Sequence, residues 1–234
     1  MKIHSGKRER KLTRTKLKDR QLPDYTRGEE IFNMVSHIVG GALGVVAVTL
    51  CVIFAAIRHN VWGVVGGAIY GAALIVLYTM SSIYHGLKPP TAKKVFQVID
   101  HCSIFLLIAG TYTPIALSSL RSYSPALGWV IFGVIWALAA LGITLNAIDL
   151  KKYSVFSMIC YLFMGWLVIF AAKPTYLALG LPAIIFLLAG GVSYTVGAVI
   201  YVACRKKRYG HSIFHIFVVL GSLLHFFCIL FYVV

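Results

Sequence analysis

Long, uninterrupted apolar runs dominate this sequence of 234 residues and limit what it can fold into. Several of these runs exceed 18 residues, and a helix that crosses a bilayer needs about 20 apolar residues. The chain is 59% hydrophobic and only 12% charged, which a water-soluble core does not require. A transmembrane β-barrel would instead alternate polar and apolar residues in stretches of about ten, and no such pattern occurs. We therefore expect an all-α membrane protein that crosses the bilayer several times.

Seven apolar segments can be delimited, and they predict one bundle of seven transmembrane helices. The segments cover about residues 31–57, 61–84, 101–120, 126–148, 154–172, 176–204 and 212–234. Pro174 and Pro182 indicate a short irregular piece before the sixth span proper. No connection is long enough to fold alone. The expected organisation is therefore a basic cytoplasmic tail over residues 1–28 and a seven-helix transmembrane domain over residues 29–234.

The distribution of Lys and Arg predicts the orientation of the bundle. Alternate connections, starting with the N-terminal tail, hold ten, three, two and four Lys or Arg, nineteen in all, whereas the other side holds three. Cytoplasmic loops carry the excess of positive charge in membrane proteins. We expect a cytoplasmic N-terminus and an external C-terminus in the plasma membrane. Because much of the formal charge of +15 lies in the tail, the expected partners of the tail are anionic lipid headgroups and not nucleic acid.

Histidines gather at the predicted cytoplasmic edge. His211 and His215 open the last segment and lie on one helix face, about 6 Å apart along the axis. A packed or hydrogen-bonded pair is one interpretation; a shared ion is the other, because zinc–nitrogen bonds are about 2.0–2.1 Å. In the predicted topology the second segment ends at the same edge with His85, and the third begins there with Asp100. An acid placed within the membrane is by default a candidate functional residue.

These residues predict a catalytic metal site. His85, His211 and His215 could supply three nitrogen ligands and leave a fourth position for water, as catalytic zinc sites do. Asp100 would then hold that water by a hydrogen bond and accept its proton. Ser81 shares a helix face with His85 and could donate to a substrate carbonyl, or else bond back to its own helix. The alternative to a metal site is a buried polar cluster that stabilises the bundle without any ion.

Three further polar residues share one face near the inner end of the first segment. Glu30, Asn33 and His37 stand at i, i+3 and i+7. They either join helices by hydrogen bonds or form an outer shell that orients the metal ligands. His225 lies about 15 Å further along the last segment than His215, which is too far for the same ion. We expect His225 to be buried and hydrogen-bonded.

The haemolysin III family has three motif blocks that this chain resembles, namely Glu30-x-x-Asn33-x-x-x-His37, Ser81-x-x-x-His85 with Asp100, and His211-x-x-x-His215. That family is grouped with the progestin and adiponectin receptors (PAQR) and, more distantly, with the alkaline ceramidases, which hydrolyse lipid amides. The resemblance covers about residues 29–234. It implies a seven-helix fold with zinc bound by His85, His211 and His215, and with Asp100 reaching the metal through water.

Three functions are compatible with this reading of the sequence. A zinc-dependent hydrolase would cleave a lipid amide or ester whose acyl chain lies within the bundle, so membrane lipids are the expected ligands or substrates. A membrane-homeostasis regulator or receptor-like lipid sensor would use zinc structurally. A pore-forming cytolysin would need a polar stripe through the bilayer, and the outer halves of these segments offer little beyond Tyr, Ser and Thr. We favour the hydrolase.

Overall fold

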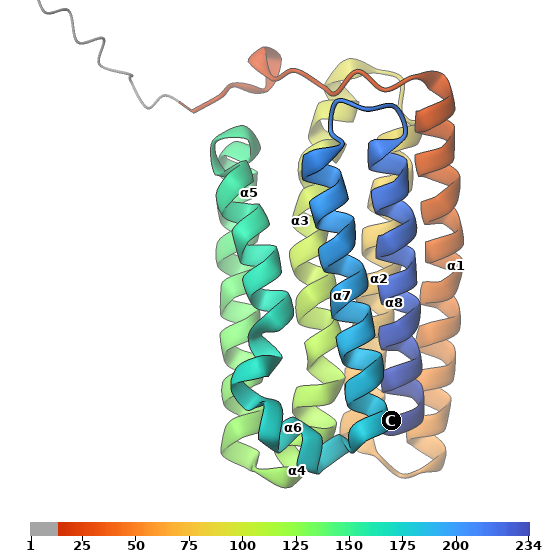
Figure 1. Cartoon of the computed structure of the whole chain (residues 1–234), viewed down its shortest axis with the longest axis vertical. Helices are drawn as coiled ribbons and strands as arrows, with labels where there is room; N and C mark the ends of the chain where they lie inside the picture. The colour runs from red at the N-terminus through yellow and green to blue at the C-terminus, as the bar shows by residue number, and fades with distance from the viewer. Residues whose placement is uncertain (1–13) are drawn as a thin grey trace, which may run out of the picture.

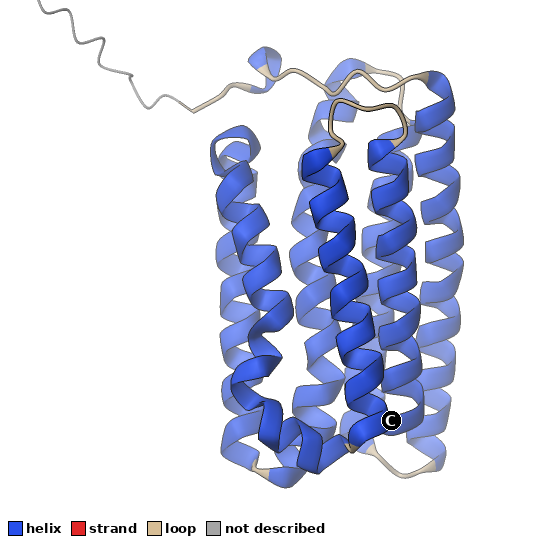
Figure 2. Ribbon diagram, in the orientation of Figure 1, coloured by secondary structure: helices blue, strands red, loops and turns tan. Residues whose placement is uncertain are grey.

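Helices make up most of the chain in the computed structural model, which describes residues 14–234 (Figure 1). No strand occurs among these residues (Figure 2). The helices are α1 (Arg27–Ile57), α2 (Val61–Gly86), α3 (Pro90–Pro114), α4 (Arg121–Tyr123), α5 (Pro125–Trp166), α6 (Ala172–Leu179), α7 (Leu181–Ala203) and α8 (Gly210–Tyr232). Short 3-10 helices cover Leu17–Asp19 and Leu167–Ala171, and a π-helix covers Ile115–Leu120. Part of the predicted basic tail lies outside the described residues: Lys2, Lys7, Arg8, Arg10 and Lys11.

Six helical stretches in the described chain are long and apolar enough to cross a membrane, whereas the sequence predicted seven. The difference arises at Pro125–Leu179, a run of 55 residues that combines the predicted segments 126–148 and 154–172. Within this run α5 leaves helical geometry at Asp149, with φ −158° and ψ 92°, and its ribbon turns back there (Figure 1). The two predicted segments therefore lie on the two arms of one sharply bent helical run, and the second segment continues past the end of α5 at Trp166.

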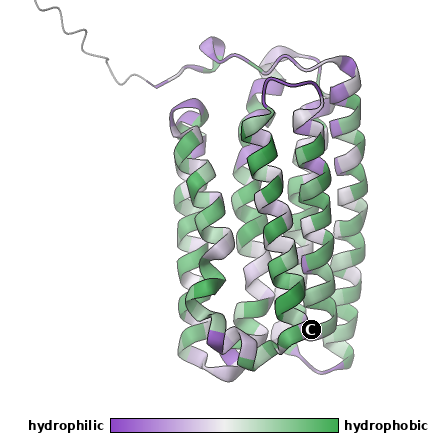
Figure 3. Ribbon diagram, in the orientation of Figure 1, coloured by the Kyte–Doolittle hydropathy of each residue, from purple (hydrophilic) through white to green (hydrophobic). Residues whose placement is uncertain are grey.

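Hydrophobic residues cover most of the length of the helices, and hydrophilic residues gather at the two ends of the bundle (Figure 3). Many large apolar side chains point outward; Phe170 is 82% exposed and Val155 is 72% exposed. Such surfaces are unfavourable in water, because exposing apolar surface to water costs about 25 cal/mol of free energy for each Å². They suit the hydrocarbon of a bilayer. The chain is a multi-span membrane protein.

The ends of the helices follow from local sequence signals. Thr26 and Glu29 form a capping box at the start of α1, in which Thr26 Oγ1 accepts from the Glu29 amide and Glu29 Oε2 accepts from the Thr26 amide. Pro90 occupies the first turn of α3, where its fixed φ favours a helix start. The third span thus begins well before residue 101, where the sequence placed it. Asp100 consequently lies inside the helix, about 15 Å from its first residue, and not at its start.

Close backbone contacts and buried hydrogen bonds hold the bundle together. A Cβ atom at Gly71 of α2 would lie 2.6 Å from the Cα atom of Val48 in α1, so only glycine allows this approach. Two tyrosines converge on Ser222 of α8: Tyr78 of α2 donates to its Oγ at 2.7 Å, and the Tyr194 hydroxyl of α7 lies 2.7 Å from the same atom. Small residues and interhelical hydrogen bonds are what join helices in a membrane. The hydrogen bonds at Ser222 join α8 to α2 and to α7.

The two arms of α5 are joined to each other and to α3. Ser157 Oγ donates to Asn146 Oδ1 at 2.5 Å, which links one arm to the other. Tyr161 Oη donates at 2.7 Å to the backbone oxygen of His101 in α3. The bent helix α5 therefore packs on α3, while α7 packs mainly along α8.

Candidate metal centre

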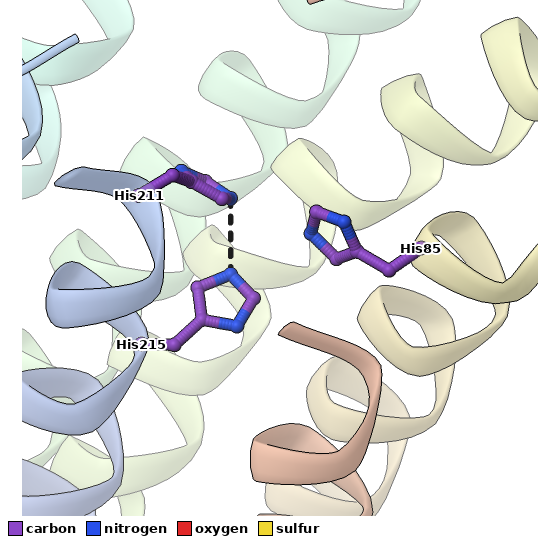
Figure 4. A group of neighbouring side chains, drawn as sticks. All are labelled: His85, His211 and His215. Atoms are coloured by element: carbon purple, nitrogen blue, oxygen red, sulfur yellow. Dashed lines mark hydrogen bonds between the residues drawn. The ribbon is translucent and has the colours of Figure 1, made fainter. Parts of the chain in front are cut away.

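Three histidines meet at the end of the bundle where α2 ends and α8 begins (Figure 4). His85 comes from the last turn of α2, and His211 and His215 come from the first two turns of α8. One ring nitrogen of each lies within 4.8 Å of those of the others. His211 Nε2 and His215 Nε2 are 3.0 Å apart. Two nitrogens on one tetrahedral zinc ion would be about 3.3 Å apart, given bonds of about 2.0–2.1 Å. The spacing therefore suits a shared ion as well as a hydrogen bond.

Two ring nitrogens of the cluster, His85 Nε2 and His211 Nδ1, are buried without a hydrogen-bond partner among the described residues. His85 Nε2 has no hydrogen bond to any of the described residues, although the other ring nitrogen of His85 is engaged. Buried polar atoms are almost always paired, so an orphaned one requires an explanation such as a missing ion. Figure 4 shows the ring of His85 facing the pair on α8 across a short gap. The three histidines fit a metal ion with nitrogen ligands.

Glu30 of α1 holds His85 in place. Its Oε2 lies 2.6 Å from His85 Nδ1, and its Oε1 lies 2.8 Å from Lys93 Nζ. Lys93 Nζ also donates at 3.3 Å to the backbone oxygen of His85. A carboxylate at Nδ1 fixes the ring and favours the tautomer whose Nε2 is free to bind a metal. The sequence did not single out Lys93, although Pro90 indicates a helix start that places Lys93 near the end of α2.

His215 is surrounded by residues from the inner end of α1. Its Nδ1 lies 3.3 Å from the backbone oxygen of Asn33 and 3.4 Å from Ser36 Oγ. The ring of His37 stacks on it, with 3.6 Å between the ring centroids and 12° between the planes. Asn33 Oδ1 accepts a bond of 2.7 Å from Ser212 Oγ. The predicted face of α1 thus contacts both histidine-bearing helices, and Ser36 is a contact that the sequence did not indicate.

Tyr25 covers the site from the chain segment before α1. Its ring stacks on His211 at 5.1 Å between centroids and lies 5.9 Å from the His85 ring. Burial raises the pKa of the Tyr25 hydroxyl, so the side chain stays neutral. Sequence reasoning missed this residue. The available signal was that Tyr25 is the single aromatic residue in the basic tail.

Asp100 and Ser81 line a cavity together with His211 and His215. The cavity has a volume of about 680 Å³, and its wall includes Asp100, Ser81 and His211. Asp100 is buried, and its Oδ2 lies 3.8 Å from His101 Nδ1. In the described chain, Asp100 does not belong to the group of three histidines whose ligand nitrogens lie within 4.8 Å of one another. Ser81 Oγ has no hydrogen-bond partner among the described residues, so it does not bond back to its own helix.

The cavity extends from the histidines deep into the bundle. His211 and His225 both line it, and they lie about 21 Å apart along α8 by the helical rise. Much of the wall between them is apolar and includes Ile104, Leu107, Ile108, Met158, Leu162 and Val218. His225 is half-buried, and its Nε2 lies 3.2 Å from the backbone oxygen of Leu187, in agreement with the expected hydrogen bond. This histidine is separate from the cluster.

Fold and site together define a multi-span helical membrane protein with a possible metal-binding histidine triad. The chain belongs to the haemolysin-III-related family, which matches residues 25–226. It is 40% identical over 205 residues to hemolysin-3 of Bacillus cereus, a match that covers 88% of this chain and 92% of that relative. It is 38% identical over 210 residues to a hemolysin-3 homolog of Bacillus subtilis, covering 90% and 97%.

A more distant relative supports the expected relationship to the PAQR family. The monocyte to macrophage differentiation factor of Homo sapiens is 27% identical over 207 residues, which covers 85% of this chain and 79% of that protein. The family resemblance predicted from the three motif blocks is thus confirmed. All three blocks fall within the residues that the family matches.

Proposed function

We propose that this protein is a metal-dependent hydrolase of lipid amides or esters, with zinc held by His85, His211 and His215. The cavity of about 680 Å³ that opens beside these histidines carries the proposal. Ligand pockets commonly measure about 300–1,000 Å³. Its length of about 21 Å exceeds the roughly 15 Å that one leaflet contributes to the hydrocarbon core. An acyl chain can lie in it with its carbonyl at the histidines.

The surrounding residues have the chemistry that such a reaction needs. A zinc ion bound at the three histidines would supply a Lewis acid that polarises a carbonyl. The Asp100 carboxylate is buried beside them and can accept a proton. The Ser81 hydroxyl, without a partner in the described chain, can donate to a carbonyl oxygen as negative charge develops on it. Tyr25 and Glu30 keep the histidines oriented and partly shielded from water.

The proposal includes a topology. Seven crossings follow if both arms of α5 span the bilayer; the first arm, residues 125–149, would be about 36 Å long against a hydrocarbon core of about 30 Å. The charge bias of nineteen to three supports a cytoplasmic N-terminus, an external C-terminus and a metal site near the cytoplasmic face of the plasma membrane. Lys151 and Lys152 at the turn of α5 belong to the same side.

A second function has an observation in its favour. The histidine cluster joins α2 to α8, and Glu30 and Asn33 join it to α1. A metal at this point would clamp three helices, and a lipid in the adjoining cavity would touch the same cluster. A receptor-like lipid sensor or membrane-homeostasis regulator with structural zinc would use this arrangement without turnover.

Acyl release from lipid amides and esters in nanodiscs separates these functions. We expect wild-type turnover that falls about 100-fold or more in Asp100→Asn, the scale of general acid–base catalysis, with zinc still bound. Asp24→Asn serves as the control, because Asp24 is exposed and does not line the cavity. Turnover that is unchanged in Asp100→Asn would contradict the proposed role of this residue. No turnover on any lipid by the wild type would favour the sensor.

A further inference from the structure

The segment that precedes α1, residues 14–26, crosses the end of the bundle that holds the histidines (Figure 1). It is attached at two places before it reaches α1. The Thr15 amide donates at 2.7 Å to Asp149 Oδ2 at the turn of α5. Lys94 Nζ of α3 donates at 3.1 Å to the backbone oxygen of Lys18. This segment, here the entry segment, therefore forms part of the wall at the mouth of the cavity.

Arg20 of the entry segment is buried, and no acid within residues 14–234 forms an ion pair with it. Its side chain lines the cavity, and the residue is only 7% exposed. Its Nε and Nη1 atoms are buried and make no hydrogen bond within residues 14–234, and no ion pair in that range includes it. Burial lowers the pKa of Arg20, although an arginine keeps its charge in proteins.

The charge of Asp149 acts on Arg20, but the two side chains form no ion pair. The carboxylate of Asp149 accepts from the backbone amides of Thr15 and Lys152, at 2.7 Å and 3.1 Å. A buried charge is normally paired, because the loss of hydration is otherwise uncompensated. A buried guanidinium that lines a cavity and has no ion pair within residues 14–234 therefore indicates an anionic ligand.

The charges around the cavity indicate where such a ligand would place its anion. Lys151 at the turn of α5 and Arg205 just after α7 line the same cavity as Arg20. Asp100, beside the histidines, is the one acid among the described residues that line it. The mouth is thus cationic, while the deeper wall is largely apolar. This distribution suits an amphipathic anion, and the planar guanidinium of arginine matches the geometry of a phosphate group.

We propose that the cavity binds a lipid that carries a phosphate group, with the phosphate at Arg20 and the acyl chain in the bundle. The inference rests on the lipid occupant of the proposed function and adds its headgroup; it does not depend on hydrolysis. Tyr25, which stacks on His211, follows Arg20 by five positions, so their Cα atoms lie at most about 18 Å apart. One lipid can therefore place its phosphate at Arg20 and its first chain atoms beside the histidines. A neutral lipid would leave Arg20 unpaired.

The test compares two lipids that differ only in the phosphate. The full chain is purified in a non-ionic detergent, and native mass spectrometry measures the binding of 1-O-octadecenylglycerol and of its 3-phosphate. Both lipids are ether-linked and resist hydrolysis. We expect the wild type to bind the phosphorylated lipid about tenfold or more tightly than the neutral one, because hydrogen bonds to charged groups are strong. Arg20→Gln should abolish most of this preference, and Arg20→Lys should retain part of it.

Arg27→Gln is the matched control, because Arg27 is exposed, lies on the same stretch of chain and does not line the cavity. It should keep the full preference. Equal binding of both lipids by the wild type would overturn the headgroup assignment. The assignment would also be overturned if the Arg20→Gln variant melted at the wild-type temperature and still preferred the phosphorylated lipid.

Further results distinguish this inference from binding of a soluble anion and from the proposed function itself. If glycerol 3-phosphate or inorganic phosphate displaces the phosphorylated lipid at the lipid's own affinity, the anion belongs to a soluble compound and the lipid assignment is overturned. If neither lipid binds, the proposed lipid function fails together with the inference. If both lipids bind equally, the proposed lipid function stands and only the assignment of a phosphate headgroup is overturned.

Discussion

Glu30 offers a test of how the site is built, because it touches His85 without being a candidate ligand. In Glu30→Gln the carboxylate that lies 2.6 Å from His85 Nδ1 and 2.8 Å from Lys93 Nζ is replaced by a neutral amide of the same shape. Hydrogen bonds to charged groups contribute about 1.5–3 kcal/mol. At about 1.4 kcal/mol for each factor of ten, zinc affinity should fall about 10- to 100-fold. Outer-shell substitutions at metal sites lose affinity on this scale.

The assay is zinc competition against a chromophoric chelator with purified protein in detergent, in which the chelator reports the free ion. Lys93→Gln should lose less than Glu30→Gln, since Lys93 reaches the histidine only through the carboxylate and a backbone oxygen. Asp24→Asn removes an exposed carboxylate close by and should leave the affinity unchanged. Wild-type affinity in Glu30→Gln, or an equal loss in Asp24→Asn, would refute the reasoning.

Two other predictions concern topology and packing. A cysteine introduced at Lys88 should resist a membrane-impermeant reagent applied to intact cells, and one at Lys173 should react; the reverse pattern would overturn the predicted orientation. Gly71→Ala should lower the melting temperature, because its Cβ would press on the backbone of α1, and overpacking of this kind costs about 1–3 kcal/mol. Gly133→Ala should melt like the wild type, because its Cβ would meet no atom of the described chain within 4 Å; equal melting of both variants would contradict the close approach.

The sequence predicted the helical membrane architecture and the convergence of the histidines. Apolar runs longer than 18 residues specify spanning helices whatever their neighbours do. The spacing of His211 and His215 places both on one face of α8. Because successive spans cross the membrane in opposite directions, the second predicted segment ends on the side where the seventh begins, which places His85 at the same end. These are consequences of helix geometry and charge bias, so they needed no knowledge of tertiary contacts.

The parts that were missed depend on contacts between distant residues. The turn of α5 at Asp149 has no glycine or proline in the residues that follow it, so the sequence showed two segments but not one bent helix. The burial of Arg20 and the stacking of Tyr25 arise because the entry segment lies across the bundle. Within a run of basic residues, neither differs in local pattern from a solvated tail. Lys93 was counted as a loop charge because the start of α3 was placed too late.

Metal analysis of the purified protein tests the central claim most directly. Wild-type protein should hold about one zinc ion per chain, and His211→Ala and His215→Ala should each lose most of it, since two remaining nitrogens bind the ion poorly. His225→Ala is the matched control, because this histidine lies on the same helix but about 15 Å beyond His215, and it should keep its zinc. Full zinc retention in both His211→Ala and His215→Ala would contradict the ligand set proposed for this protein.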